Sequence, residues 1–194
     1  MAGKGKWIGL GIVGILIIYS VSMYNGLVSA EEAVTASWSQ VENVYQRRAD
    51  LIPNLVETVK GYAAHEKEAL TGVVEARAKA TSTTIDANNL DANTIQKFQQ
   101  AQDGLSSALS KLMVVVERYP DLKANQTFLQ LQAQLEGTEN RIAVERKRFI
   151  EKAQTYNTGR KKFPKVLFAN MFGFDEKAYF NATEGADKAP EVKF

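Results

Sequence analysis

The fold is decided by Val34–Ala80, VTASWSQVENVYQRRADLIPNLVETVKGYAAHEKEALTGVVEARAKA, in which mostly apolar residues recur in alternating steps of four and three. A sustained period of 3.5 residues is typical of a helix that packs lengthwise against other helices. We therefore predict one long helix over 34–80, continuous with the helical segment before it. The repeating positions, called the stripe below, are Val34, Trp38, Val41, Tyr45, Arg48, Ile52, Leu55, Val59, Tyr62, Glu66, Ala69, Val73, Ala76 and Ala80.

Pro53 lies inside this segment and lacks the backbone N–H that a helix needs there. Its ring also clashes with the carbonyl of Ala49, four residues earlier. Because the stripe keeps its phase across Pro53, the pattern favours a kink, with a complete break of the helix as the alternative.

A second helix is predicted after a polar loop. Residues 81–93 have no apolar repeat, which indicates a loop. Asn93 followed by Gln96 resembles a capping box, so we expect it to open the second helix. Pro120 is expected to end that helix.

A third helix is predicted from about Asn125 to Gly159, a residue that suits a helix C-cap. A short helix is expected near 165–171, with the aromatic residues of 163–180 folded back onto the bundle. Residues 181–194 are polar and read as a tail. The sequence thus predicts an all-α fold: an N-terminal transmembrane helix followed by an antiparallel up-and-down bundle of four-helix type, with three long helices and a short C-terminal one.

The stretch Trp7–Tyr24 is eighteen residues long and contains no charged residue. At 1.5 Å per residue it spans ~27 Å, close to the hydrocarbon thickness of a bilayer, and its ends carry aromatic rings that favour the membrane interface. A cleaved signal peptide is the alternative, because Val28-Ser29-Ala30 suits a signal peptidase. The apolar run exceeds the usual length of such signals, about 7–15 residues, so we expect a retained anchor.

The charges that flank the anchor predict its orientation. Lys4 and Lys6 precede it, whereas Glu31 and Glu32 follow it and no basic residue occurs before Arg47. The positive-inside rule then places the N-terminus in the cytoplasm and the bundle outside it, in the periplasm of a bacterium with two membranes. The expected parts are a cytoplasmic N-terminus (1–6), the anchor (7–24), the bundle (25–180) and the C-terminal tail (181–194).

The overall charge argues against one class of partner. The chain has 24 Lys and Arg against 22 Asp and Glu, and the two N-terminal lysines account for the whole excess. Proteins that bind duplex nucleic acid carry a basic face, so a neutral bundle predicts no nucleic-acid partner.

The sequence also lacks the usual catalytic groupings. It contains no Cys, which excludes disulfides and thiolate zinc sites, and its single histidine cannot complete a His-Glu-x-x-His pair. It has neither a Gly-x-Ser-x-Gly elbow nor a Gly-rich phosphate loop. We therefore expect no metal, no cofactor and no catalysis.

Charged residues on the apolar helix faces are the candidate functional residues. Arg48 and Glu66 interrupt the stripe, and the third helix carries a polar stretch that includes Glu139, Asn140 and Arg146. Because a buried charge must be paired, one interpretation is that these groups meet opposite charges on facing helices and set the helix register. The other is a polar groove that binds a partner segment or ligand. An enclosed cavity joining Arg48, Glu66 and Glu139 would favour an enzyme.

Several motifs, in order, resemble the LemA family. They are RRADLIPNLV at 47–56, AR at 76–77, YPDLKAN at 119–125 and TENRI at 138–142. The resemblance extends from Tyr24 to the C-terminus. It implies a bacterial single-pass inner-membrane protein with an antiparallel helical bundle and no established enzymatic activity. It also implies relatives in magnetosome membranes and genes that often lie near those of membrane-bound proteases.

We therefore expect a scaffold or adaptor of the cell envelope that acts through protein–protein interaction or self-assembly. Its expected partners are the lipid bilayer and either further copies of itself or another membrane protein, a membrane protease among the candidates. Direct membrane remodelling is one alternative, and an envelope enzyme that uses an Arg/Glu patch is another. The candidate residues of the polar core or partner groove are Arg48, Asn54, Glu66, Arg77, Glu139, Asn140 and Arg146.

Overall fold

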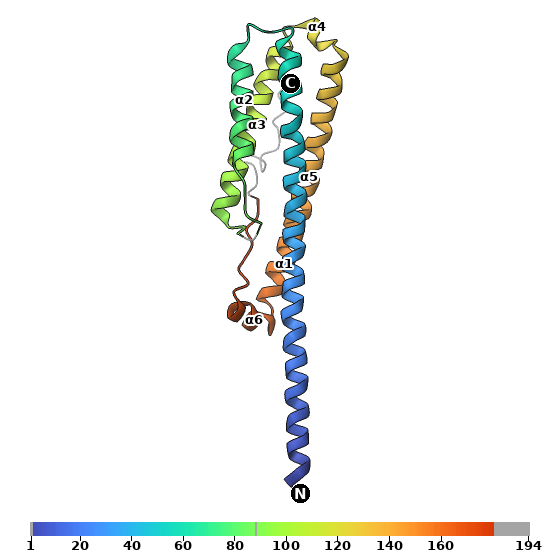
Figure 1. Cartoon of the computed structure of the whole chain (residues 1–194), viewed down its shortest axis with the longest axis vertical. Helices are drawn as coiled ribbons and strands as arrows, with labels where there is room; N and C mark the ends of the chain where they lie inside the picture. Colours follow the sequence, from blue (N-terminus) through green and yellow to red (C-terminus); the bar gives the residue numbers. More distant parts are fainter. Residues whose placement is uncertain (1, 88, 181–194) are drawn as a thin grey trace, which may run out of the picture. The chain divides into compact units, whose positions relative to one another are not determined.

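The computed structural model describes residues 2–87 and 89–180, and in that part of the chain it contains helices and no strands (Figure 1). Helix accounts for 83% of it, which confirms the predicted all-α fold with a long apolar N-terminal helix and a helical bundle. The helices are α1 (Ala2–Lys60), α2 (Lys67–Ser82), α3 (Ala92–Val116), α4 (Pro120–Lys123), α5 (Gln126–Lys161) and α6 (Lys165–Phe172).

The chain divides into two compact units, and α1 and α5 each contribute residues to both. The first unit contains residues 1–44 and 141–177. Of the described residues, the second contains 45–87, 89–140 and 178–180. Each unit is described by itself below.

The prediction of a single helix over 34–80 is wrong, because the chain reverses direction between α1 and α2 (Figure 1). In the turn, the amide of Ala63 donates to the carbonyl of Val59, and the amide of Glu66 donates to the carbonyl of Ala63. Gly61 starts this turn, and glycine is a poor helix former. The stripe continues in phase on α2 because both helices bury it in one core, so the period does not reveal the turn.

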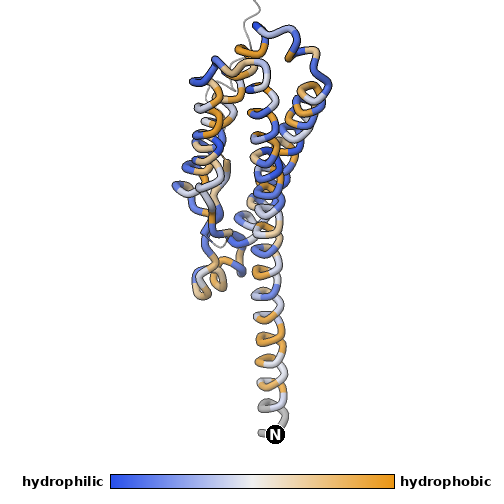
Figure 2. Tube along the Cα trace, turned by 45° about the horizontal axis from the view of Figure 1, so that its top comes forward, coloured by the Kyte–Doolittle hydropathy of each residue, from blue (hydrophilic) through white to orange (hydrophobic). Residues whose placement is uncertain are grey.

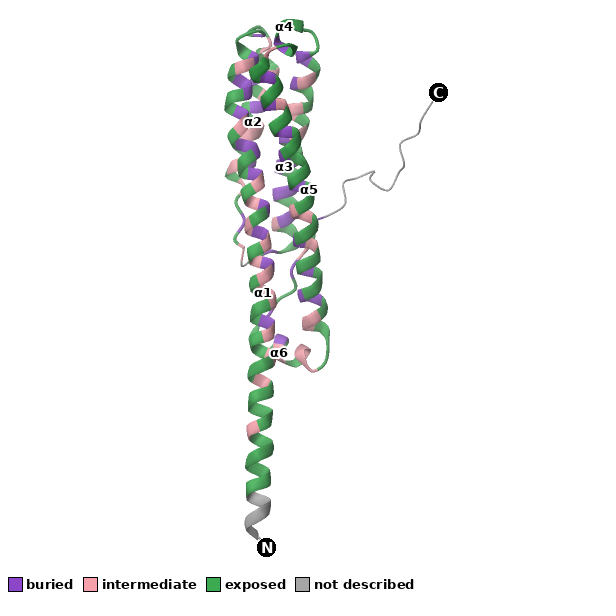
Figure 3. Ribbon diagram, turned by 90° about the vertical axis from the view of Figure 1, so that its right-hand side faces the viewer, coloured by how far each residue is buried: buried purple, intermediate pink, exposed green. Residues whose placement is uncertain are grey.

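The second unit is an up-and-down bundle of four helical segments, whereas the prediction had three long helices and a short C-terminal one. They are the end of α1, α2, α3 and the beginning of α5, each antiparallel to the one before it (Figure 1). Buried residues line their inner faces (Figure 3). Burying a Leu, Val or Phe side chain is worth about 1.5–3 kcal/mol, so this core supplies most of the stability. Its most buried members include Ile52, Leu55, Val59, Val73, Leu105, Leu112, Leu122 and Phe128.

The first unit packs α1 against α5 through aromatic side chains. Trp38 and Phe149, both fully buried, meet edge to face with ring centroids 5.2 Å apart. Edge-to-face pairs of this kind add about 0.5–1.5 kcal/mol to the burial of the rings. The stripe position Trp38 is therefore a principal contact between the two long helices of this unit.

The first part of α1 is apolar and unpacked. None of its most hydrophobic 18-residue window is buried, and Figure 2 shows the orange apolar residues along it. Among the described residues, α1 is the one helix that is long and apolar enough to cross a membrane. Exposed Ile, Leu and Val side chains on all sides of a helix are what contact with lipid requires.

The helix ends differ from the prediction by a few residues. Asp91 rather than Asn93 caps α3, because its carboxylate accepts the amide N–H of Thr94 at 2.9 Å. The Thr94 hydroxyl donates to the same carboxylate, and this hydrogen bond is the main reason that the pKa of Asp91 lies below its ordinary value. An aspartate at this position satisfies one of the free N–H groups of the first helical turn.

The C-terminal elements follow the prediction more closely. The expected short helix near 165–171 is present as α6. The third long helix is α5, but it continues past Gly159 and ends at Lys161. Pro120 opens the short helix α4 after α3 has ended. The predicted tail, 181–194, lies outside the described residues.

Candidate functional site

Arg48 is buried in the second unit, with its side chain 3% exposed. Its guanidinium donates four hydrogen bonds to residues of α3 and α5. The acceptors are Ser106 Oγ at 3.0 Å, Glu139 Oε2 at 2.9 Å, Gln102 Oε1 at 2.7 Å and the Gln102 carbonyl at 3.3 Å. The guanidinium also lies over the ring of Tyr45, 5.1 Å from its centre. The planar fork of arginine suits such multiple acceptors.

The Arg48–Glu139 ion pair is buried at one end and open at the other, because the Glu139 side chain is 59% exposed. A pocket of about 360 Å³ between α3 and α5 has both residues in its wall, together with Ser106 and Met113. Arg48 Nε has no hydrogen-bond partner within the described part of the chain. The pocket therefore has the acidic Glu136 and Glu139 in its wall, with the buried guanidinium of Arg48 beside Glu139.

Gln102 ties α2 to the same group of residues. Its side-chain amide donates to the carbonyl of Ala80, 3.3 Å away, while its Oε1 accepts from Arg48. Ala80 lies in the last turn of α2, where carbonyls lack a partner within the helix. One amide thus links the end of α2 to the buried arginine.

Pro53 lies inside α1, and the helix continues through it, so the alternative of a break is wrong. Because Pro53 has no N–H, the carbonyl of Ala49 loses its normal helical donor. Arg77 of α2 supplies the replacement: its Nε donates to the Ala49 carbonyl at 2.7 Å. Pro53 therefore weakens α1 but leaves the Ala49 carbonyl free to accept the hydrogen bond that holds α2 against α1.

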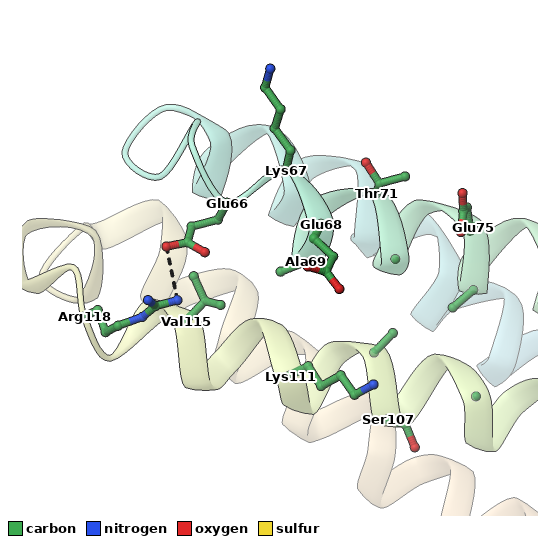
Figure 4. Close-up of a pocket in the computed structure, with 14 residues that line it drawn as sticks. Glu66, Lys67, Glu68, Ala69, Thr71, Glu75, Ser107, Lys111, Val115 and Arg118 are labelled. Carbon is green, nitrogen blue, oxygen red and sulfur yellow. Dashed lines mark ion pairs between the residues drawn. The ribbon is translucent and has the colours of Figure 1, made fainter.

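Glu66 belongs to a different cluster at the α1–α2 turn. It forms an ion pair with Arg118 at 3.1 Å (Figure 4). It also accepts a hydrogen bond from the Tyr119 hydroxyl at 3.0 Å. That hydrogen bond raises the pKa of Tyr119 above its ordinary value. Small residues of α2 and α3, Gly72 and Gly104 among them, leave a groove of about 890 Å³ beside the cluster, rimmed by charged side chains.

The predicted residues therefore do not form one site. Arg48 pairs with Glu139 of α5, whereas Glu66 pairs with Arg118, which lies in the turn after α3. Asn54 and Asn140 are exposed. Arg146 is half-buried and belongs to the first unit.

Sequence analysis missed a polar cluster in the first unit. The Asn157 amide donates to the carbonyl of Lys177 at 2.7 Å and accepts its N–H at 3.0 Å. The Lys177 side chain, 6% exposed, forms an ion pair with Glu31 of α1 at 2.6 Å. The sequence gives no signal for this contact, because a lysine twenty residues after Asn157 has no periodic relation to it.

The Tyr156 ring lies against the same cluster, 5.8 Å from Lys177 Nζ, and its hydroxyl donates to the carbonyl of Asp175 at 2.9 Å. Burial is the main reason that the pKa of Tyr156 rises to about 12, and the negative charge of Glu31 adds to it. The residues around it hold the segment 174–177 against the last turns of α5.

The hydrogen bonds of Arg48 and Arg77 hold neighbouring helices of the second unit against one another. Arginine stays protonated and cannot act as a general base at ordinary pH. Among the described residues, no three His, Cys, Asp or Glu side chains are grouped closely enough to hold a metal ion. The arrangement can orient a carboxylate or exchange one ion-pair partner for another.

Comparison with known proteins places the chain in a family. The model of the LemA family matches residues 37–194, well over half of the sequence. The chain belongs to the LemA family. The match begins just before Trp38, so it includes the stripe from Trp38 onwards and the arginines Arg48 and Arg77.

Relatives within the LemA family include proteins of magnetosomes. Magnetosome protein MamQ of Magnetospirillum gryphiswaldense is 28% identical over 181 residues, which cover 84% of this chain and 66% of the relative. Magnetosome protein MamQ 2 of Paramagnetospirillum magneticum is 28% identical over 207 residues, covering 95% of this chain and 76% of the relative. Protein LemA of Metamycoplasma hominis is 22% identical over 172 residues, covering 89% of this chain and 75% of the relative. None of these names specifies a reaction.

Replacing Arg48 by Met is expected to lower the free energy of unfolding by about 2 kcal/mol, because the buried oxygen of Gln102 loses its donor. Replacing the neighbouring, exposed Arg47 by Met is the matched control and should change it by less than about 0.5 kcal/mol. Thermal unfolding of the full chain in detergent, followed by circular dichroism, measures both. Equal effects of the two substitutions would contradict the assigned role of Arg48.

Tyr156 is expected to ionise with a pKa well above the ordinary value for tyrosine. A folded pKa of about 12, against ~10 in the unfolded chain, means that its contribution to stability is complete below about pH 10 and is lost as the pH rises towards 12. The difference in absorbance at 295 nm between the protein and its Tyr156→Phe variant should titrate near pH 12. A midpoint close to pH 10 would show that the ring is solvated.

Proposed function

We propose that this LemA protein is a membrane-anchored helical scaffold or adaptor that recruits protein partners or further copies of itself at the bacterial inner membrane. The observation that carries the proposal is the continuity of α1. One unbroken helix contains an exposed apolar stretch suited to lipid and, further along, the buried stripe at the core of the bundle. The element that would anchor the protein thus also organises its folded body.

The proposed orientation has the N-terminus in the cytoplasm and the bundle outside it. Lys4 and Lys6 precede the apolar stretch, and acidic Glu31 and Glu32 follow it. The excess of lysine on one flank supports this direction of insertion. In a bacterium with two membranes, the bundle would then lie in the periplasm.

The arrangement of the charged groups supports a scaffold over an enzyme. A hydrolase built on the polar patch would need an acid and a base in one cavity. Arg48 and Glu139 instead bind each other, and Glu66 is engaged by Arg118 in a separate cluster. The similarity to MamQ and LemA proteins also supports association of this chain with a membrane.

The surface of the bundle offers positions where partners would be found. Large apolar side chains are exposed on three of its helices: Val74 on α2, Val114 on α3, and Leu129 and Val144 on α5. Isolated exposed apolar residues are ordinary. They are nevertheless useful positions for cross-linking residues, because a substitution at an exposed position does not change the buried core.

An alkaline phosphatase fused to the C-terminus of the full chain is expected to be active in a bacterial host, because that enzyme folds only outside the cytoplasm. The same fusion with Lys4 and Lys6 changed to Glu should be less active, since the lysine asymmetry is removed. Activity of a cytoplasmic reporter at the C-terminus, with an inactive phosphatase fusion, would overturn the orientation.

Photo-reactive residues placed at Val74, Val114, Leu129 or Val144 in living cells are expected to capture protein partners from at least one face. The exposed Lys152 on α5 serves as a polar control position. Cross-linked species would be separated by electrophoresis and identified by mass spectrometry. Recovery of monomer alone from all positions would contradict the scaffold proposal.

A further inference from the structure

The segment that contains α6 exposes an unusual number of large apolar side chains. Phe163 is 82% exposed, Met171 66%, Leu167 59% and Phe172 53%. The sequence predicted that aromatic residues here would fold back; Phe174 does, but Phe163 does not. A cluster of exposed apolar residues is characteristic of a surface that contacts another apolar phase or partner.

Contacts with α1 set the level of this segment along the apolar helix. The ring of Phe172 meets that of Tyr24 edge to face at 5.0 Å, and Phe174 meets it at 5.6 Å. A pocket of about 630 Å³ is lined by Tyr19 and Met23 of α1 and by the residues that lead into α6. Tyr24 ends the stretch proposed to span the membrane, so α6 would lie at the bilayer surface.

Two lysines place positive charge at the same level. Lys162 and Lys165 both line this pocket, and neither side chain forms an ion pair or hydrogen bond within the described ranges. The neighbouring Lys161, by contrast, is bound to Glu176 at 2.7 Å. The ammonium of Lys165 lies against Gly26 of α1, 3.6 Å from where a Cβ would be.

The height of these charges matches that of lipid phosphates. Gly26 is two residues beyond Tyr24, which corresponds to ~3 Å along the helix away from the hydrocarbon. The Phe172 ring therefore lies at the level of the span's end, and the Lys165 ammonium lies just outside it. This is the order in which a bilayer presents acyl chains and then phosphates.

We propose that α6 and the turn before it form a second membrane contact, in which Lys162 and Lys165 bind the headgroup of an anionic phospholipid and Phe163, Leu167 and Met171 enter the interface. The pocket's volume is that of a small-molecule site, and Thr158 in its wall can donate a further hydrogen bond to a phosphate. This inference rests on the proposed transmembrane anchor.

A lipid fits this surface better than a protein segment does. The pocket is continuous with the stretch proposed to span, since Tyr19 and Met23 belong to that stretch and to the pocket wall alike. Any occupant must therefore be accommodated beside lipid-facing residues. The positive charges of the unpaired lysines attract the phosphate of an anionic lipid. A zwitterionic lipid, which has no net charge, attracts them less strongly.

The chain contains no cysteine, so single fluorescent labels are straightforward to place. Full-length Leu167→Cys, labelled with an environment-sensitive fluorophore and reconstituted into vesicles of phosphatidylcholine and phosphatidylglycerol, should be quenched by lipids with a nitroxide near the headgroup. Val144→Cys, on α5 and ~21 Å along the helix from Thr158, is the matched exposed position and should not be quenched. Leu16→Cys reports on the anchor itself and should be quenched by nitroxides deep in the acyl chain.

The three labels separate the two proposals. Quenching at Leu16 without quenching at Leu167 would overturn the second contact and leave the anchor standing. No quenching at Leu16 would overturn the anchor and the second contact together. A Leu167 label that is shielded both from lipid quenchers and from iodide in solution would show that a protein covers α6, which also overturns the lipid assignment.

Headgroup selectivity is tested with the same label. Nitroxide-labelled phosphatidylglycerol should quench it several times more strongly than labelled phosphatidylcholine at equal mole fraction, because each lysine–phosphate contact favours the anionic lipid about fivefold. Lys162→Gln with Lys165→Gln should abolish the difference, whereas Lys147→Gln with Lys152→Gln, both exposed on α5, should preserve it. Equal quenching by the two lipids in the unsubstituted background would overturn the headgroup site.

Discussion

The second unit depends on the need of a buried guanidinium for acceptors. Arg48 occupies a position of the stripe that would otherwise be apolar, and removing its charge from water is costly unless every facing helix supplies an oxygen. Ser106, Gln102 and Glu139 meet that requirement from α3 and α5. Because a shift of either helix by one turn would leave the guanidinium unpaired, the charge selects one register among many that apolar packing alone would tolerate.

A second arginine, Arg77, supplies a hydrogen-bond donor to a backbone carbonyl that lacks one. The proline in α1 leaves a carbonyl without a donor inside the bundle, and an orphaned buried carbonyl carries a penalty comparable to a lost hydrogen bond. Arg77 reaches this carbonyl from α2. The two arginines act on different helices, so together they specify the arrangement of all four segments, while the apolar core supplies the free energy that holds them.

Much of this was predictable from the sequence. The stripe identified residues that are buried, Trp38 and Ile52 among them, since burial is what a 3.5-residue period records. It could not locate the hairpin at Gly61, because in this chain the steps of three and four continue through the turn from Val59 to Val73. Pairing of Arg48 with a facing acid was expected on electrostatic grounds, but the contributions of Ser106 and of the Ala49 carbonyl depend on three-dimensional placement. The Asn157–Lys177 contact was not predictable, because it joins a helix to a segment outside any helix, where the sequence has no periodic pattern.

That last contact has a consequence for how the fold can vary. One side-chain amide gives the backbone of Lys177 both a donor and an acceptor, as a neighbouring β-strand would, and Arg160 adds a bond to the carbonyl of Phe174. The chain thus leaves α5 at Lys161 and contacts the same helix again at Lys177. The segment 162–176 is therefore a loop whose two ends are both held by α5, and it is called the excursion here. The entropy of closing such a loop grows only slowly with its length. Insertions, deletions or wholesale replacement of the excursion should therefore be tolerated by the helices that hold it, which makes α6 a module that can diverge while the rest of the architecture stays constant.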